Sequence, residues 1–172
     1  CMRMMTGLTP PTSGHATILG KKYDELTNPG RHVGVLLDAS AQHAGRTGRE
    51  VLTLGAKTMG LGTDRVDEIL DVVGLTPPEA KRRVGDYSLG MRQRLGIGHA
   101  LLGDPDVLIL DEATSSVDPS TDVAVGRALD ELMRGRTSFV IAHRLATAEK
   151  ADEIWVMDAG RLVQRGSHVE LV

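Results

Sequence analysis

Hydrophobic positions along this chain follow two different patterns. Short continuous apolar runs at residues 33–37 and 107–110 are typical of strands that are buried on both faces. Between them, apolar side chains at positions 66, 69, 70 and 73 recur at helical spacing and predict an amphipathic helix over residues 64–73. Strands that alternate with helices predict an α/β fold with a mostly parallel sheet covered on both sides.

Local signals predict where other elements begin. Thr47 and Glu50 have the spacing of a capping box that opens a helix to about residue 59, and Ser88 is an N-cap candidate for a helix to about residue 102. The segment from about residue 39 to 103 therefore reads as a helical insert. The remaining predicted helices lie at 2–5, from 77, at 120–133, at 146–151 and after Ser167; the remaining strands lie at 15–19, 31–37, 137–142, 153–157 and 161–163.

Composition narrows the class of protein. The chain has 172 residues, enough for one globular domain, and aromatic residues make up 2%, so the core must be largely aliphatic. The net charge of -3 gives no global reason to expect nucleic acid as a partner. Cys1 is the single cysteine, which excludes an internal disulfide and fits a reducing compartment. No stretch approaches the roughly 18 apolar residues that span a bilayer, so work at a membrane would require a partner.

Two carboxylates follow the apolar run at 107–110. Asp111 and Glu112 would stand at the carboxyl end of a buried strand, which is the edge where open α/β sheets bind ligands. An acid there can hold Mg²⁺ beside the phosphates of a nucleotide, and a second acid one step further can take a proton from an attacking water. A polar loop after an apolar strand is the alternative that these residues alone leave open.

A serine and a glycine stand where the helix after residue 88 is predicted to begin. In Ser88-Leu89-Gly90-Met91, exposed N–H groups, a hydroxyl and the helix dipole would attract an anion such as a γ-phosphate. Taken alone, a plain N-cap by Ser88 explains the same residues.

Two further patterns lie downstream. Residues 115–119, Ser-Ser-Val-Asp-Pro, form by themselves a helix N-cap with Pro at a tolerated position. His143 follows the predicted strand 137–142, so it would lie at the same sheet edge as Glu112. A lone histidine in such a place is more often a structural residue than a catalytic one.

In order and spacing, these motifs together resemble the ATP-binding domain of ABC transporters. Residues 88–91 are similar to the signature motif of that family, and residues 107–112 to its Walker B motif with the catalytic glutamate. Residues 115–118 are similar to its D-loop, His143 to its switch histidine, and residues 160–168 to its closing hairpin. The resemblance extends over essentially the whole chain.

The sequence departs from the family's pattern in three ways. The phosphate-binding loop Gly-x-x-x-x-Gly-Lys-Ser/Thr is absent, and residues 2–5 look like the helix that normally follows it. Asp38 stands where the family usually has the glutamine of its Q-loop; a carboxylate can bind Mg²⁺ but cannot donate a hydrogen bond as glutamine does. Finally, residues 1–112 look like separate ATP-binding subunits of drug and antibiotic export systems, whereas residues 113–172 look more like ATPase domains fused to exporter membrane domains.

The resemblance implies a P-loop NTPase (RecA-like) fold that is incomplete at its N-terminus. A RecA-like core would comprise residues 1–38 and 104–172, and a helical subdomain would comprise residues 39–103 of this single partial domain. It also implies a head-to-tail dimer, in which each ATP lies between the phosphate loop of one domain and the signature motif of the other.

The same resemblance implies a role for each site residue. Asp111, together with Asp38, would bind Mg²⁺; Glu112 would polarise the attacking water, and His143 would contact the γ-phosphate. The nucleotide-binding residues would be those of the signature motif and the D-loop: Ser88, Leu89, Gly90, Met91, Ser116 and Asp118.

The predicted function is ATP hydrolysis that powers an ABC transporter, with export favoured over import. The expected ligands are ATP and Mg²⁺. The expected partners are a second ATP-binding domain and a transmembrane permease domain or subunit, with no nucleic acid, and the expected location is the cytoplasmic face of the cell membrane. The 172 residues alone are expected to be inactive, because phosphoryl transfer depends on the groups that position the phosphates.

Two alternatives stay open. The missing phosphate loop also fits a nucleotide-incompetent fragment, or a degenerate partner that only completes the site of another subunit. A third function is that of ABC ATPases that act on DNA or ribosomes rather than in transport. Those proteins often carry two cassettes or a coiled-coil insert, and this sequence shows neither.

Overall fold

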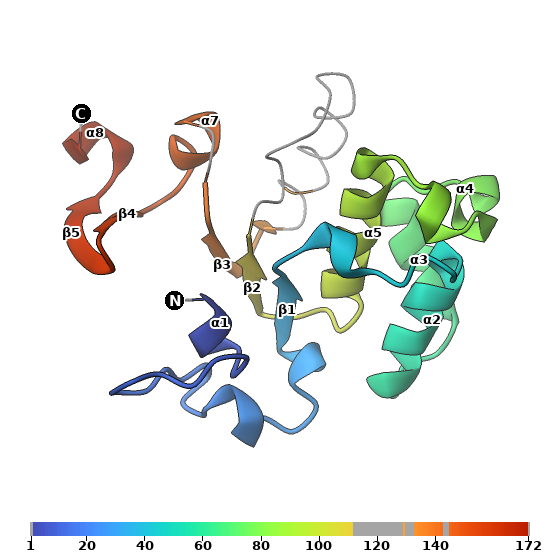
Figure 1. Cartoon of the computed structure of the whole chain (residues 1–172), viewed down its shortest axis with the longest axis horizontal. Helices are drawn as coiled ribbons and strands as arrows, with labels where there is room; N and C mark the ends of the chain where they lie inside the picture. Colours follow the sequence, from blue (N-terminus) through green and yellow to red (C-terminus); the bar gives the residue numbers. More distant parts are fainter. Residues whose placement is uncertain (1, 112–128, 130–132, 143–144, 172) are drawn as a thin grey trace. The chain divides into compact units, whose positions relative to one another are not determined.

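The computed structural model describes residues 2–111, 129, 133–142 and 145–171 (Figure 1). The chain divides into two compact units, Cys1–Val140 and Ile141–Val172. The first unit contains a three-stranded sheet and the second a two-stranded one. Among the described helices, none is long and apolar enough to cross a membrane.

The sheet of the first unit is parallel. Strands β1 (Val33–Leu36), β2 (Val107–Leu110) and β3 (Thr137–Val140) lie in the order β1-β2-β3. β2 pairs with both neighbours, and Leu110 lies opposite Leu36 and Val140. All four residues of β2 are buried, which confirms the prediction from its unbroken apolar run.

Alternate residues of β2 face two different cores. Val107 and Ile109 pack with Ile18 and with partly buried side chains of the N-terminal segment, including those of the short helix α1 (Met2–Met5). Leu108 and Leu110 pack in a larger cluster with the helices that follow β1. The sheet is therefore covered on both faces, as the α/β prediction requires.

The N-terminal segment differs from the prediction at one point. Residues 15–19 do not form a strand: Ile18 and Lys21 form an isolated bridge around a two-residue turn. Leu19 and Gly20 both have positive φ, 53° and 78°, as a tight reversal of the chain requires. Two single turns of 3₁₀ helix follow, η1 (Tyr23–Glu25) and η2 (Pro29–Arg31), and the second shortens the start of β1 relative to the predicted 31–37.

Residues 39–101 form a layer of helices on one side of β1 (Figure 1). Thr47 caps α2: its hydroxyl accepts from the Glu50 N–H at 3.2 Å, and the Glu50 carboxylate accepts from the Thr47 N–H at 2.8 Å. Both this capping box and the helix spacing at 64–73 are confirmed. The elements of the layer are η3 (Ala39–Ala41), α2 (Gly48–Thr58), α3 (Asp64–Val72), α4 (Pro77–Lys81), η4 (Val84–Asp86) and α5 (Leu89–Leu101). We call this set the helical layer.

The second unit consists of a helix, a hairpin and a last turn of helix. Strands β4 (Ile154–Asp158) and β5 (Arg161–Gly166) pair antiparallel across Ala159 and Gly160, which both have positive φ. Before the hairpin lies α7 (Leu145–Ala148), and after it α8 (His168–Leu171). β5 is longer than the predicted partner at 161–163.

Candidate functional site

The carboxyl-terminal edge of the parallel sheet carries two of the predicted metal ligands. Asp111 follows β2 directly, is partly buried, and donates its backbone N–H to the Leu36 carbonyl at 2.7 Å. Asp38 comes two residues after β1 and is exposed. Because β1 and β2 are parallel and Leu36 pairs with Leu110, both carboxylates emerge at the same edge.

Local hydrogen bonds set the backbone at Asp38. Its carboxylate oxygen accepts from the Ser40 N–H at 2.7 Å and so caps η3, the turn that leads into the helical layer. One carboxylate oxygen of Asp38 is thereby engaged in capping. The other oxygen, at this exposed position, can bind a cation or water.

Four of the predicted site residues lie outside the described residues: Glu112, Ser116, Asp118 and His143. Their roles stay predictions.

The predicted phosphate-contacting residues form the first turn of α5, and we call Ser88, Leu89, Gly90 and Met91 the helix mouth. Ser88 is the N-cap, with extended backbone (φ −62°, ψ 163°), and its hydroxyl accepts from the Met91 N–H at 3.2 Å. The first intrahelical bond runs from the Arg92 N–H to the Ser88 carbonyl. The N–H groups of Leu89 and Gly90 precede that bond, so they belong to the set that helices leave for other partners.

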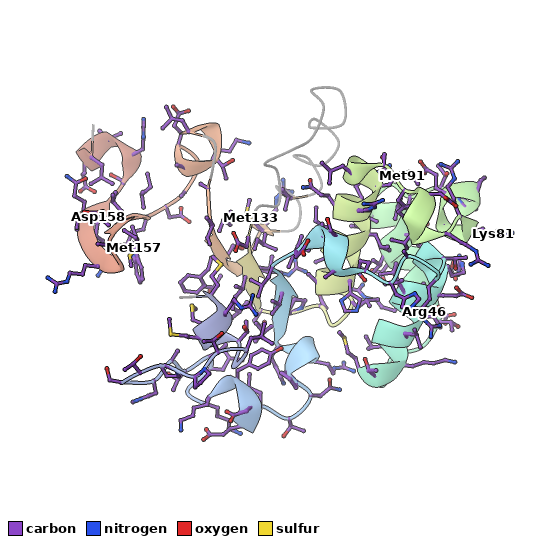
Figure 2. The ribbon with its side chains drawn as sticks, in the orientation of Figure 1. Arg46, Lys81, Met91, Met133, Met157 and Asp158 are labelled. Carbon is purple, nitrogen blue, oxygen red and sulfur yellow. The ribbon has the colours of Figure 1, made fainter. Side chains whose placement is uncertain are left out.

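Exposure divides the helix mouth into two halves. Ser88 and Leu89 are exposed, whereas Gly90 and Met91 are buried, and Figure 2 shows Met91 at the start of α5 within the helical layer. Met91 therefore contributes packing to the site, and the exposed polar groups come from Ser88 and the backbone. A helix dipole with free N–H groups suits an anion.

Sequence reasoning did not identify a cavity of about 290 Å³ beside η3. Its lining combines apolar side chains with two imidazoles, an amide and a guanidinium: Gln42, His43, Arg46, Val51, Leu54, Gly55, Thr58 and His99. Burial lowers the pKa of His99 from its ordinary value, so this side chain favours its neutral form. A single histidine on a helix carries no pattern that could have revealed this cavity in the sequence.

Comparisons with known proteins agree with this architecture. A sequence profile of the family described as "ABC transporter" matches residues 1–115. The chain is 41% identical over 175 residues to the "Multidrug resistance ABC transporter ATP-binding and permease protein" of Lactococcus lactis subsp. cremoris (strain MG1363), covering 94% of this chain and 29% of that protein. It is 37% identical over 171 residues to the "Bacitracin transport ATP-binding protein BcrA" of Bacillus licheniformis, covering 95% of this chain and 55% of that protein.

Solved structures show the same fold. A dimeric ATP-binding cassette in a post-hydrolysis state with ADP and Pi superposes with a TM-score of 0.84 at 21% identity, over 96% of this chain and 78% of that one. A bacterial Atm1-family ABC exporter with ATP bound superposes with a TM-score of 0.80 at 26% identity, over 98% of this chain and 31% of that one. With respect to the two curated relatives named above, the chain spans about a third of the length of the first and about half of the length of the second. It belongs to the ABC transporter family and has the fold of the ATP-binding cassette.

Proposed function

We propose that this chain is part of an ATP-hydrolysing domain that powers export across a membrane. The observation that carries the proposal is the pair of carboxylates, Asp38 and Asp111, at the carboxyl-terminal edge of a parallel sheet in a cassette fold. Ligands of open α/β sheets bind at that edge. The names of two relatives, a multidrug resistance transporter and a bacitracin transport protein, favour export as the direction.

The residues at the sheet edge fit a hard cation. Mg²⁺ prefers oxygen ligands, and it is usually bound by one or two carboxylates together with substrate phosphates rather than by a complete protein cage. Consistent with that, the described residues contain no cluster of three or more His, Cys, Asp or Glu that could hold a metal. Asp111, together with Asp38 at the same edge of the sheet, would hold Mg²⁺, which would neutralise developing charge on the phosphates.

The chemistry of hydrolysis would fall to residues that follow the strands. Glu112 would accept the proton of the attacking water, since it comes directly after Asp111. His143, which follows β3 in the sequence, would donate a hydrogen bond to the γ-phosphate. Asp111 would orient the phosphates through its cation while Glu112 acts on the water.

The helix mouth would act on the ATP of a second domain. Ser88 and Leu89 are exposed at the start of α5, and the N–H groups of Leu89 and Gly90 precede its first intrahelical hydrogen bond; the helix dipole there favours the γ-phosphate. In a head-to-tail dimer, Ser116 and Asp118 would lie beside the same nucleotide. ATP would then hold two domains together until hydrolysis releases them.

A membrane partner would contact the region around Asp38. η3 is the first element of the helical layer after the proposed nucleotide edge of the sheet, and Gln42, which follows η3, lines the cavity together with Arg46. A segment of a permease seated there would sense changes at Asp38. The domain would accordingly work at the cytoplasmic face of the membrane.

The decisive test is Glu112→Gln in the full-length protein. Glutamine keeps the shape of glutamate but cannot accept a proton, so hydrolysis should fall by about 10²- to 10⁴-fold. ATP binding should survive, because Asp111 rather than Glu112 is proposed to act on the phosphates. Near-normal phosphate release from this variant would refute the assignment of the base.

The dimer supplies a second readout for the same variant. With ATP and Mg²⁺, Glu112→Gln should accumulate as a closed dimer of ATP-binding domains, which size-exclusion chromatography of the domain detects. Adding Ser88→Arg places a bulky cation at the helix mouth and should abolish that dimer. A dimer that persists with Ser88→Arg would mean that the helix mouth does not contact nucleotide.

A further inference from the structure

Tyr87 immediately precedes the helix mouth and is buried, with 4% of its surface exposed. Its hydroxyl donates to the backbone carbonyl of Glu79 in α4 at 2.8 Å. Its own backbone N–H donates to the Val84 carbonyl at 3.1 Å. The residue that leads into Ser88 is therefore fixed at both its side chain and its backbone.

The ring of Tyr87 lies against Gly48, the first residue of α2. A Cβ added to Gly48 would overlap the Tyr87 hydroxyl oxygen and would lie 3.0 Å from Cζ and 3.4 Å from Cε2. Gly48 has an ordinary helical backbone and needs no special φ. The position thus requires glycine for space, and the space is taken by this tyrosine.

A second link joins α4 to α5. The Glu79 carboxylate accepts from the Thr76 N–H and hydroxyl at 2.8 and 2.7 Å, and it pairs with Arg94 of α5 at 3.6 Å. Arg94 also donates to the Gly74 carbonyl. Glu79 consequently contacts the residue that leads into α5 through Tyr87 and the second turn of α5 through Arg94.

These contacts determine where the helix mouth points. Ser88 follows Tyr87 by one peptide bond, so a shift of the ring away from Gly48 and Glu79 would move the Ser88 hydroxyl and the N–H groups behind it. Misplacement of a catalytic contact by about 1 Å can cost about 100-fold in rate. The start of α2, the Glu79 carbonyl of α4 and the residue that leads into α5 meet at this one side chain.

We propose that Tyr87 is a positioning residue for the helix mouth, held between Gly48 and the Glu79 carbonyl so that Ser88 meets the γ-phosphate of the partner's ATP. This inference rests on the proposed function of the helix mouth. Tyr87 itself touches no nucleotide; it acts through the backbone of Ser88.

The test uses three variants of the full-length protein: Gly48→Ala, Tyr87→Phe and the double variant. Gly48→Ala should lower kcat for ATP hydrolysis by about tenfold or more, because the new methyl group displaces the hydroxyl. Tyr87→Phe keeps the ring and loses one hydrogen bond, so kcat should fall by about threefold. The double variant should recover part of the rate that Gly48→Ala loses, because removal of the hydroxyl relieves the overlap with its oxygen and leaves only the closer ring contact, 3.0 Å from Cζ.

Two measurements separate positioning from general damage. ADP lacks the γ-phosphate, so its affinity reports nucleotide binding without the helix mouth and should stay at the wild-type value in all three variants. Tyr23→Phe is the matched control: Tyr23 packs on the other face of the sheet, and loss of its hydroxyl should leave kcat unchanged.

Each outcome decides between the two proposals. If Ser88→Arg retains wild-type kcat, the proposed function of the helix mouth fails, and the role of Tyr87 fails with it. If Ser88→Arg abolishes hydrolysis but Gly48→Ala retains wild-type kcat, or the double variant is no faster than Gly48→Ala, the role of Tyr87 alone is overturned. Should Gly48→Ala not fold, Tyr87→Phe decides: a wild-type kcat overturns the proposal, and a lowered kcat with unchanged ADP affinity supports it.

Discussion

The helix mouth and the edge of the sheet are built in different ways, although both are proposed to handle phosphate. The mouth depends mostly on contacts between residues that are close in the chain, such as Ser88 with Met91 and Arg92 with Gly85, and on one long-range contact, that of Tyr87 with Gly48. The edge depends on the pairing of β1 with β2, which places Leu36 beside Leu110. The whole helical layer lies between these two residues in the sequence. Local contacts require little loop closure, whereas strand pairing over a long separation must first overcome it.

This difference separates stability from function. The side chains of β2, the central strand of the sheet, are buried, so their loss should affect folding first. Ser88 and Leu89 of the mouth are exposed, so loss of their side chains should affect folding less and the proposed chemistry more. The predictions below test this contrast, beginning with the largest expected effect.

The sheet should be the most sensitive to substitution. Leu108 is completely buried in β2 and packs beneath the helical layer. Leu108→Ala should lower the free energy of unfolding by about 2–5 kcal/mol, because the cavity it leaves adds to the lost burial. Urea unfolding of the purified ATP-binding domain measures this loss.

A matched substitution controls for leucine itself. Leu54 on α2 has 43% of its surface exposed, and Leu54→Ala should change the free energy of unfolding by about 0.5 kcal/mol or less. Equal losses from both variants would contradict the view that the sheet core dominates stability.

The second-largest loss of stability should come from a substitution at the C-terminal end of α5. Arg65 of α3 donates from Nε to the Leu102 carbonyl at 3.1 Å and from Nη2 to the Leu101 carbonyl at 3.0 Å. Arg65→Met keeps the apolar stem but leaves these carbonyls without their charged donor. The free energy of unfolding should therefore fall by about 1.5–3 kcal/mol.

An exposed arginine of the same layer supplies the control for that variant. Arg49 pairs with Asp67 at the surface, where the two side chains are 39% and 60% exposed. Arg49→Met should cost about 1 kcal/mol or less, since exposed ion pairs contribute little. If Arg49→Met proved as costly as Arg65→Met, the loss would come from removing any arginine rather than from uncapping α5.

The two ends of α5 also show what the sequence could and could not predict. The starts of α2 and α5 were predictable because each carries its own cap, Thr47 or Ser88, within one turn. The capping of α5 by Arg65 was not predictable, because nothing in the sequence around Arg65 indicates which helix end it reaches. Long-range side-chain contacts of this kind appear only once the helices are packed.

The sheet and the candidate site show the same division. The apolar run of β2 predicted a buried strand, and the structure confirms it. The strand predicted at 15–19 was wrong, because Leu19 and Gly20 reverse the chain there. Asp38 and Asp111 lie at the predicted edge of the sheet. Their roles stay predictions, like those of the four site residues outside the described part of the chain, and assays of binding and hydrolysis are needed to test them.

Two N-caps offer a smaller and more specific contrast. Ser88 and Thr47 each accept from a backbone N–H at 3.2 Å, in α5 and α2 respectively. Ser88→Ala and Thr47→Ala should each lower the free energy of unfolding by about 1 kcal/mol. In the full-length protein, however, only Ser88→Ala should lower kcat, because only that hydroxyl is proposed to meet a phosphate. A comparable fall in kcat from Thr47→Ala would show that loss of a cap, rather than loss of a phosphate contact, slows hydrolysis.

The smallest expected effect is a pH dependence at the packing of α5 against α2. His99 lies against Gly55 of α2 and lines the cavity together with His43 and Arg46. Burial lowers the pKa of His99 below its ordinary value of 6.5, so the folded state favours the neutral imidazole more than the unfolded state does. The resulting stability is present above pH 6.5 and is lost as the pH falls towards the lower folded pKa.

His99→Gln cannot take up that proton, so its free energy of unfolding should fall less than that of the wild type between about pH 7 and pH 5. Urea unfolding at a series of pH values gives both curves, with His15→Gln as the control for loss of an exposed imidazole. Parallel curves for the wild type and His99→Gln would show that protonation of this buried residue does not affect the packing of α5.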